Sequence, residues 1–263
     1  MKAYVVLLII LAVILITIAV IAVFLSAHAK ANQKAMQQTI DDSLKLLSER
    51  FHVDKKDAGA YAQIRIYGVM KFNTAQYAVS GIGNLSVMTT NMGFMQMVSF
   101  IITPFEKDMP LLSMDYMYMP NKRKTYTELY DLTPDKQTPE YQHILEIMNG
   151  LYETGKALTD MPRSKAAWYD DLLTVQLYKS CSADQEQRVH DLFCDAVRRY
   201  ADAADTLAPI ADDEKAVKHK LIQEYSDNLI EKGGISTDVF KKALGAETTK
   251  DFFDKVFFGN STV

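Results

Sequence analysis

The chain has 263 residues, of which 48% are hydrophobic, and a formal net charge of −4. This length is enough for one sizeable domain or two small ones. The charge is small and spread along the chain, without the basic stripe that nucleic-acid binding requires. One basic cluster, Lys122-Arg123-Lys124, is predicted to be the solvated tip of a hairpin. Nucleic acid is therefore excluded as a partner.

The first segment, residues 1–26, is predicted to be a membrane anchor. Residues 3–25 contain no charge over 23 positions, and a helix of that length, at about 1.5 Å per residue, exceeds the ~30 Å hydrocarbon core of a bilayer. A cleaved signal peptide is the alternative, because Ala27-His28-Ala29 has the form of a cleavage site. The apolar core of a signal peptide is typically ~7–15 residues, so we favour an uncleaved, single-pass membrane protein that contacts lipid through residues 3–25.

The side of the membrane on which the rest of the chain lies is left open. The α-amino group and Lys2 on one flank nearly balance Lys30 and Lys34 on the other. Cys181 and Cys194 are expected to be unpaired thiols, which favours a reducing compartment, although many exported proteins also lack disulfides.

Residues 27–59 are predicted to form a juxtamembrane helix followed by a linker. Five apolar side chains recur there at helical spacing: Met36, Ile40, Leu44, Leu47 and Phe51. The polar stretch at residues 54–59 then breaks the pattern. The globular domain is therefore expected to occupy residues 60–263.

The middle of the chain changes to the two-residue period that is typical of β-strands. Strands are predicted over residues 61–72, 75–80, 85–90, 95–103, 111–119 and 124–131. The strands at residues 95–103 and 111–119 are apolar on both faces, which indicates central strands that are covered on both sides. Because no helical pattern separates the strands, the sheet is expected to be antiparallel.

Helices are predicted to follow the strands. Thr138 and Pro139 begin the first of them, and residues 164–180 are ambiguous between a helix and a short strand. Beyond that segment the pattern is helical, with breaks at Gly233 and Gly245. This order of elements predicts an α+β fold, a three-layer α/β/α sandwich with a central antiparallel sheet, preceded by one transmembrane helix.

Asp115 is the candidate for chemistry, because an acid inside an apolar strand is either paired at a cost or chemically used. Alternation places Asp115 on one face with Ser113 and Met117, and the simplest hairpin register brings Ser99 or Ile101 near it. Methionine and leucine neighbours should raise the pKa of this carboxyl, so that it can donate a proton to a bound π-system. Ser99, Ser113 and Met117 are then the predicted ligand contacts. The alternative is a structural aspartate that is hydrogen-bonded to the backbone or to Ser113.

Other catalytic and metal-binding signatures are missing from the sequence. It contains no G-x-S-x-G, Walker or H-E-x-x-H motif. The five histidines are dispersed without metal-ligand spacing, so no metal site is predicted. His190 and Cys194 stand four residues apart on one predicted helix, and Cys194 is expected to be an inert core thiol.

Several short motifs, in order over about residues 61–258, resemble the ferredoxin-dependent bilin reductases and their relatives, the red chlorophyll catabolite reductases. A strand ending at Pro104 is followed by a short loop, then by a strand that carries Asp115, then by a strand ending in Tyr130-Asp-Leu-Thr-Pro134. The C-terminal segment, residues 225–258, is similar to the closing helices of that family.

The resemblance implies an α/β/α sandwich that binds a linear tetrapyrrole between the sheet and the C-terminal helices. Members of the family reduce the pigment with electrons from ferredoxin and protons from protein acids, without a bound cofactor, and Asp115 matches their proton-donating aspartate. The chain departs from the family in three respects. It has Val98-Ser99-Phe100 where one subgroup has a histidine, Ser113 where a glycine is usual, and a predicted membrane anchor.

Two functional hypotheses follow. The first is a membrane-anchored reductase of a linear tetrapyrrole or similar conjugated molecule, with Asp115 as proton donor and ferredoxin as electron donor, which requires a domain that faces the cytoplasm. The second is a non-catalytic membrane-tethered binding or scaffold module on the same fold.

Overall fold

Within residues 3–68, 70–163 and 166–260, which are those that the computed structural model describes, nine strands form one antiparallel sheet. Their order is β1-β3-β4-β5-β6-β7-β9-β8, and β2 also pairs with β3. The strands are β1 (Val53–Lys56), β2 (Gln63–Ile66), β3 (Met70–Val79), β4 (Gly83–Asn91), β5 (Gln96–Pro104), β6 (Leu111–Tyr118), β7 (Lys122–Tyr130), β8 (Thr159–Asp160) and β9 (Leu173–Ser182).

Four predicted segments extend beyond the described residues. Residues 1–2 of the anchor, residue 69 of a predicted strand, residues 164–165 of the ambiguous segment and residues 261–263 of the domain lie outside them.

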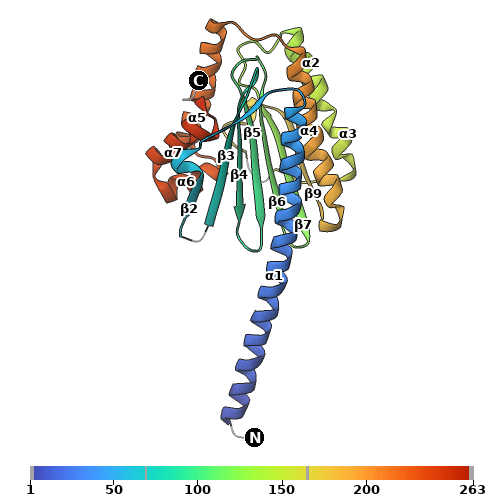
Figure 1. Ribbon diagram of the computed structural model, residues 1–263, viewed down its shortest axis with the longest axis vertical. Coiled ribbons are helices and arrows are strands. Elements are labelled where there is room, and N and C mark those ends of the chain that lie inside the picture. Colours follow the sequence, from blue (N-terminus) through green and yellow to red (C-terminus); the bar gives the residue numbers. More distant parts are fainter. Residues whose placement is uncertain (1–2, 69, 164–165, 261–263) are drawn as a thin grey trace.

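One face of the sheet is covered by α1 (Ala3–Ser48), α2 (Pro139–Asn149), α3 (Leu151–Thr154) and α4 (Glu186–Thr206) (Figure 1). The core of this layer centres on Phe193 of α4. Its ring centroid lies 5.3 Å from that of Phe100 in β5 and 4.8 Å from that of Tyr116 in β6. All three side chains are fully buried, and the apolar area that they remove from water holds α4 on the central strands.

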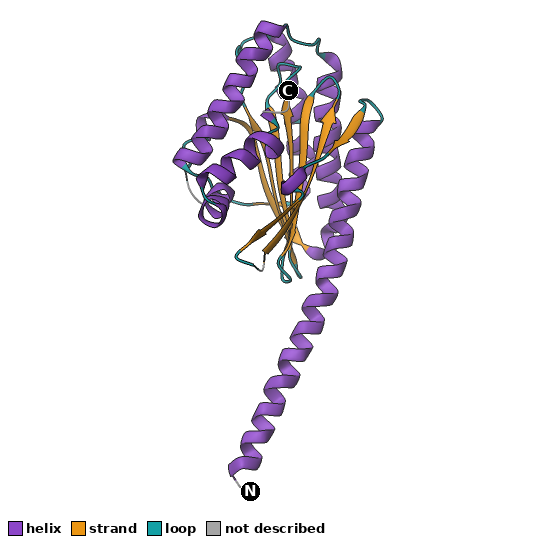
Figure 2. Ribbon diagram, turned by 60° about the vertical axis from the view of Figure 1, so that its left-hand side comes forward, coloured by secondary structure: helices purple, strands orange, loops and turns teal. Residues whose placement is uncertain are grey.

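The other face is covered by α5 (Asp212–Lys232), α6 (Ile235–Leu244), α7 (Ala246–Phe252) and a π-helical turn at Phe253–Phe257. Phe72 of β3 packs 5.1 Å from Phe240 of α6, and the hydroxyl of Ser86 in β4 donates to the carbonyl of Phe257 at 2.8 Å. Figure 2 shows the sheet between the two helical layers. The predicted α+β sandwich with a central antiparallel sheet is thus confirmed.

α1 is one helix from Ala3 to Ser48, whereas the sequence predicted an anchor and a separate juxtamembrane helix. No glycine or proline interrupts residues 3–48, so the backbone continues as a helix through the change from apolar to amphipathic sequence. The N-terminal part is exposed and is long and apolar enough to cross a membrane. The C-terminal part belongs to the core, where Met36, Ile40 and Leu47 are buried.

The single strand predicted at residues 61–72 is wrong, because β2 and β3 are separated by a turn. Tyr67 and Gly68 have φ values of 53° and 71° in this turn, a left-handed conformation that glycine favours. Ile66 pairs with Met70, an even separation along the chain, so the apolar alternation continues in phase through the turn and conceals it.

Two further strands differ from the prediction. β9 shows that the second half of the ambiguous segment at residues 164–180 is a strand. β1 is a charged edge strand in a stretch that was predicted as linker.

Arg123 is buried, against the prediction of a solvated basic tip. Its guanidinium donates to Glu186 of α4 at 2.5 Å and to Asn32 of α1 at 2.9 Å. Lys122 remains exposed. Alternation along β7 explains the difference, because it turns Arg123 towards the face that α1 and α4 cover.

Candidate functional site

Asp115 lies in the middle of β6, on the face that the C-terminal helices share. Its cross-strand partners are Ser99 of β5 and Tyr126 of β7. The hydroxyl of Ser99 donates a hydrogen bond to the carboxylate of Asp115. The hairpin register expected from the sequence is therefore confirmed, with Ser99 opposite the acid.

Burial raises the pKa of Asp115 from an ordinary 3.8 to about 6. The hydrogen bond from Ser99 acts in the other direction, because it stabilises the ionised carboxylate, and the negative charge of Glu128 raises the pKa further. An acid with such a pKa exchanges a proton near neutral pH, as general acids do.

Glu128 of β7 is a second carboxylate on the same face. It accepts hydrogen bonds from the hydroxyl of Tyr130 at 2.6 Å and from the hydroxyl of Tyr178 in β9. Burial and this carboxylate raise the pKa of both tyrosines. They therefore stay neutral donors that hold Glu128 in place.

Aromatic rings border the two carboxylates. Tyr126 and Tyr178 lie 5.4 Å apart between ring centroids. Tyr225 of α5 packs 5.1 Å from Tyr130 and 5.8 Å from Trp168. Tyr130, Tyr178 and Tyr225 are buried, whereas Tyr126 and Trp168 are half-buried and offer flat apolar surface on which a conjugated molecule can stack. We call Tyr126, Tyr130, Trp168, Tyr178 and Tyr225 the aromatic frame.

The predicted contacts Ser113 and Met117 lie on either side of Asp115 along β6. Ser113 pairs with Ile101 and Glu128, and Met117 pairs with Met97 and Lys124. Both side chains are half-buried, as is Asp115, whereas Ser99 is only 2% exposed. The structure thus brings all four predicted site residues together on one face, and their roles stay predictions.

The site contains residues that the sequence analysis did not identify. Tyr126 and Glu128 alternate on β7 in phase with Asp115, so extending the hairpin register to the next strand would have found them. Tyr178 had no such signal, because its segment was ambiguous between helix and strand.

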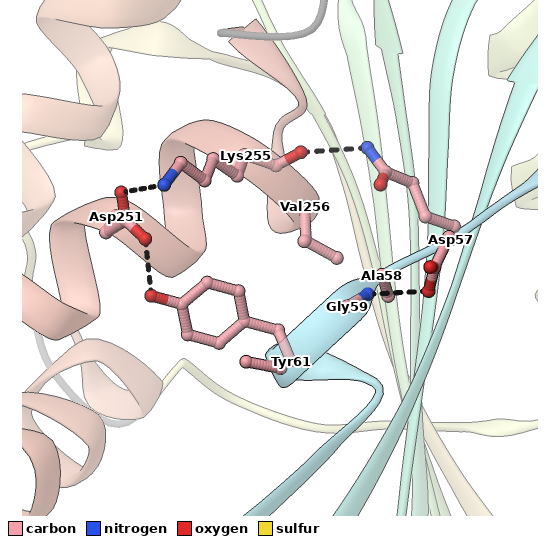
Figure 3. Close-up of a pocket in the computed structure, with 9 residues that line it drawn as sticks. Asp57, Ala58, Gly59, Tyr61, Asp251, Lys255 and Val256 are labelled. Atoms are coloured by element: carbon pink, nitrogen blue, oxygen red, sulfur yellow. Dashed lines mark hydrogen bonds and ion pairs between the residues drawn. The ribbon is translucent and has the colours of Figure 1, made fainter.

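Two hollows lie elsewhere on the surface, and Asp115 lines neither. The larger, of about 500 Å³, lies beside α7 (Figure 3). Its polar groups pair with one another, since Asp251 accepts from Tyr61 at 2.5 Å and lies 2.7 Å from the ammonium of Lys255. We interpret it as a seam between elements. The smaller, of about 340 Å³, is lined by Trp168 and Tyr225 among others and adjoins the aromatic frame.

Cys194 and His190 meet on the opposite face of the sheet. The thiol lies 3.7 Å from Nε2 of His190, and Nε2 also lies 2.9 Å from Asp42. Burial raises the pKa of the Cys194 thiol, which keeps it protonated and poorly nucleophilic. Both cysteines are free, as the sequence predicted, and both are buried, which was predicted for Cys194 alone. Among the described residues, no three metal-ligating side chains cluster as a metal site would require.

No protein-family model matches the chain, and no curated protein matches its sequence. The chain is similar in structure to phytochromobilin synthase from tomato, solved in complex with biliverdin. The TM-score is 0.67 and the sequence identity 15%, over 86% of this chain and 83% of that chain. The likeness is one of fold, and it shows that this chain has a bilin-reductase-like fold.

Proposed function

We propose that this protein is a membrane-tethered reductase of a linear tetrapyrrole or a similar conjugated molecule, with Asp115 as the proton donor. The observation that carries the proposal is the half-buried Asp115, with a pKa of about 6 and a hydrogen bond from Ser99. It lies on the sheet of a fold whose tomato neighbour was solved with biliverdin.

The surroundings of Asp115 suit a flat, partly charged ligand. Apolar surface is offered by the half-buried side chains of Tyr126, Trp168, Met97 and Met117, and methionine adapts its shape to such ligands. The hollow of about 340 Å³, which Trp168 and Tyr225 line but Asp115 does not, adjoins this surface at one side. A pigment on this face would place its π-system against Asp115.

The reaction would add two electrons and two protons to one double bond of the pigment. A reduced ferredoxin, itself oxidised, would supply one electron at a time, and Asp115 would protonate the reduced pigment and then recover its proton from solvent. No bound cofactor is needed in this scheme. The side chains of Ser99 and Glu128 would set the proton affinity of Asp115, since both affect its pKa.

The test is anaerobic turnover of biliverdin with reduced ferredoxin, followed by absorbance, for the native protein and for Asp115→Asn. The variant keeps the shape of the side chain and loses the proton, so we expect turnover to fall at least about 100-fold while pigment binding is retained. Asp54→Asn, in the exposed strand β1, is the matched control and should turn over normally. Full turnover by Asp115→Asn would contradict the role of this acid.

A non-catalytic pigment-binding module on the same fold is the second candidate. The observation in its favour is Ser99, a hydroxyl that does not titrate, directly opposite Asp115, where one subgroup of the family that the sequence resembles carries a histidine. The same experiment separates the two. If the pigment spectrum shifts on binding but shows no further change when reduced ferredoxin is added, that result would support the binding module.

A further inference from the structure

We propose that one edge of the sheet, formed by the hairpin turns nearest the membrane helix, docks on the lipid headgroups of the bilayer that α1 enters. This hairpin edge consists of Arg65, Tyr67, Lys71, Phe94 and Lys122. The proposal rests on α1 crossing the membrane and is independent of the proposed catalytic function.

The position of the hairpin edge follows from hydrogen bonds between α1 and the sheet. Asn32 donates to the side chain of Gln96 at 2.9 Å and to the carbonyl of Tyr118 at 3.2 Å, and it accepts from Arg123. Gln96, Tyr118 and Arg123 belong to one cross-strand row that continues to Asn91 and Lys71. Asn32 therefore marks the height at which α1 leaves the sheet.

The turns beyond this row point the same way as the membrane helix. Figure 1 shows the turns between β2 and β3, β4 and β5, and β6 and β7 at the end where α1 departs. From Asn32 to Leu25, the last residue of the apolar run, α1 covers about 10 Å. Phe94 lies two residues beyond Gln96, which reaches up to about 7 Å in the same direction. Because the headgroup layer is about 5–8 Å thick on each side, Phe94 falls within it.

The side chains of the hairpin edge suit that layer. Outside α1, Tyr67 and Phe94 are the two most exposed large hydrophobic side chains of the described residues, at 56% each. Aromatic side chains are enriched at the membrane–water interface. Burial in the headgroup layer would remove both rings from water.

The charges of the hairpin edge complement anionic lipid. Arg65, Lys71 and Lys122 are exposed, and Lys30 and Lys34 add two exposed cations on the adjoining turns of α1. The carboxylate of Glu186 is paired with Arg123, and Asp184 is an exposed acid at the same end of the sheet. The positive excess attracts the anionic headgroups of a bilayer.

The test uses the full chain in nanodiscs that carry nitroxide-labelled lipids. A single environment-sensitive fluorophore is attached at Phe94→Cys or at Lys122→Cys. The native Cys181 and Cys194 are buried, and labelling of the unsubstituted chain measures how much fluorophore they take up. The matched control is Val217→Cys, which is also exposed. Val217 immediately precedes Lys218 in the sequence. The ammonium of Lys218 bonds to the β5–β6 loop, at the opposite end of the sheet from the hairpin edge.

We expect lipid quenching at both hairpin-edge positions to exceed that at residue 217 by at least about twofold, and to increase when phosphatidylserine is added. Two positions are used so that a fault in one variant does not decide the result. Equal quenching at the three positions would overturn the proposal, as would failure of the native chain to insert into nanodiscs.

Discussion

Asp115 is kept partly out of water by its strand neighbours, and the fold gains nothing from ionising it. Only Ser99 among the causes of its pKa shift stabilises the charged form, while burial and Glu128 oppose it. A group that is retained in such surroundings in spite of its cost is a candidate for function rather than for stability.

The stability of the domain should therefore depend on pH through Asp115. The folded pKa of about 6 exceeds the ordinary 3.8, so the folded state binds a proton more tightly and loses stability as pH rises from about 4 to 6. A shift of about two units corresponds to about 3 kcal/mol at most. We expect the free energy of unfolding of Asp115→Asn, relative to that of the native chain, to increase by about 2–3 kcal/mol between pH 4 and pH 7.

Urea unfolding of residues 27–263, followed by the fluorescence of Trp168, measures this difference. The comparison between variant and native chain cancels the other titrating groups. A difference that does not change with pH would show that Asp115 ionises in the fold as freely as in water.

At this scale the sequence predicted the acid and its cross-strand serine, because both depend on alternation along adjacent strands. It did not predict the environment that Glu128, Tyr130 and Tyr178 create together. Tyr178 comes from a strand more than 60 residues further along the chain than Asp115, and no local pattern reports such a contact.

Among the elements, α1 has two roles along its length. Its N-terminal part has the properties of a membrane helix, and its C-terminal part is a packed helix of the first layer. The polar contacts of Asn32 with Gln96 and Arg123 lie at the boundary between the exposed N-terminal part and the packed C-terminal part.

The packed part of α1 should contribute substantially to the stability of the domain. Leu47 is fully buried, so Leu47→Ala removes apolar contacts and leaves a cavity. We expect a loss of about 2–5 kcal/mol in the free energy of unfolding. Lys45→Ala, exposed on the same turn, should change it by less than about 0.5 kcal/mol.

Urea unfolding at fixed pH measures both variants. Equal effects of Leu47→Ala and Lys45→Ala would contradict the assignment of this part of α1 to the core.

The elements that the sequence failed to predict have identifiable reasons. The turn at Tyr67 and Gly68 preserves the phase of the alternation. The edge strand β1 is too short and too charged to show an apolar alternation. The continuity of α1 is visible only as the absence of a helix breaker, which the change of pattern near residue 27 concealed.

For the whole molecule, the structure separates the apolar N-terminal part of α1, which is long enough to cross a membrane, from the folded domain. Residues 27–263 retain every residue of α1 that is described as buried, so a chain that begins at residue 27 should be soluble and should keep the pigment binding proposed for the full chain. A chain that begins at residue 49 loses Met36, Ile40 and Leu47 from the core and should aggregate. Size-exclusion chromatography and the absorbance shift of added biliverdin measure both expectations.

Pigment binding that is lost on removing residues 1–26 alone would contradict this division. It would mean that the apolar N-terminal part of α1 contributes to the binding face.

Because α1 is one continuous helix, it also fixes the rotation of the domain about the helix axis, relative to the N-terminal part of α1. Because no flexible joint separates the apolar part of α1 from its packed part, each residue added near Ser26 would turn the domain about the helix axis by about 100° and move it along that axis by about 1.5 Å. Seven added residues would move the domain by about 10 Å along the helix axis and return its rotation about that axis to within about 20° of the original. The number of residues in α1 therefore sets which side of its apolar part the Asp115 face lies above, and with it which side of that helix a protein must contact to reach this face.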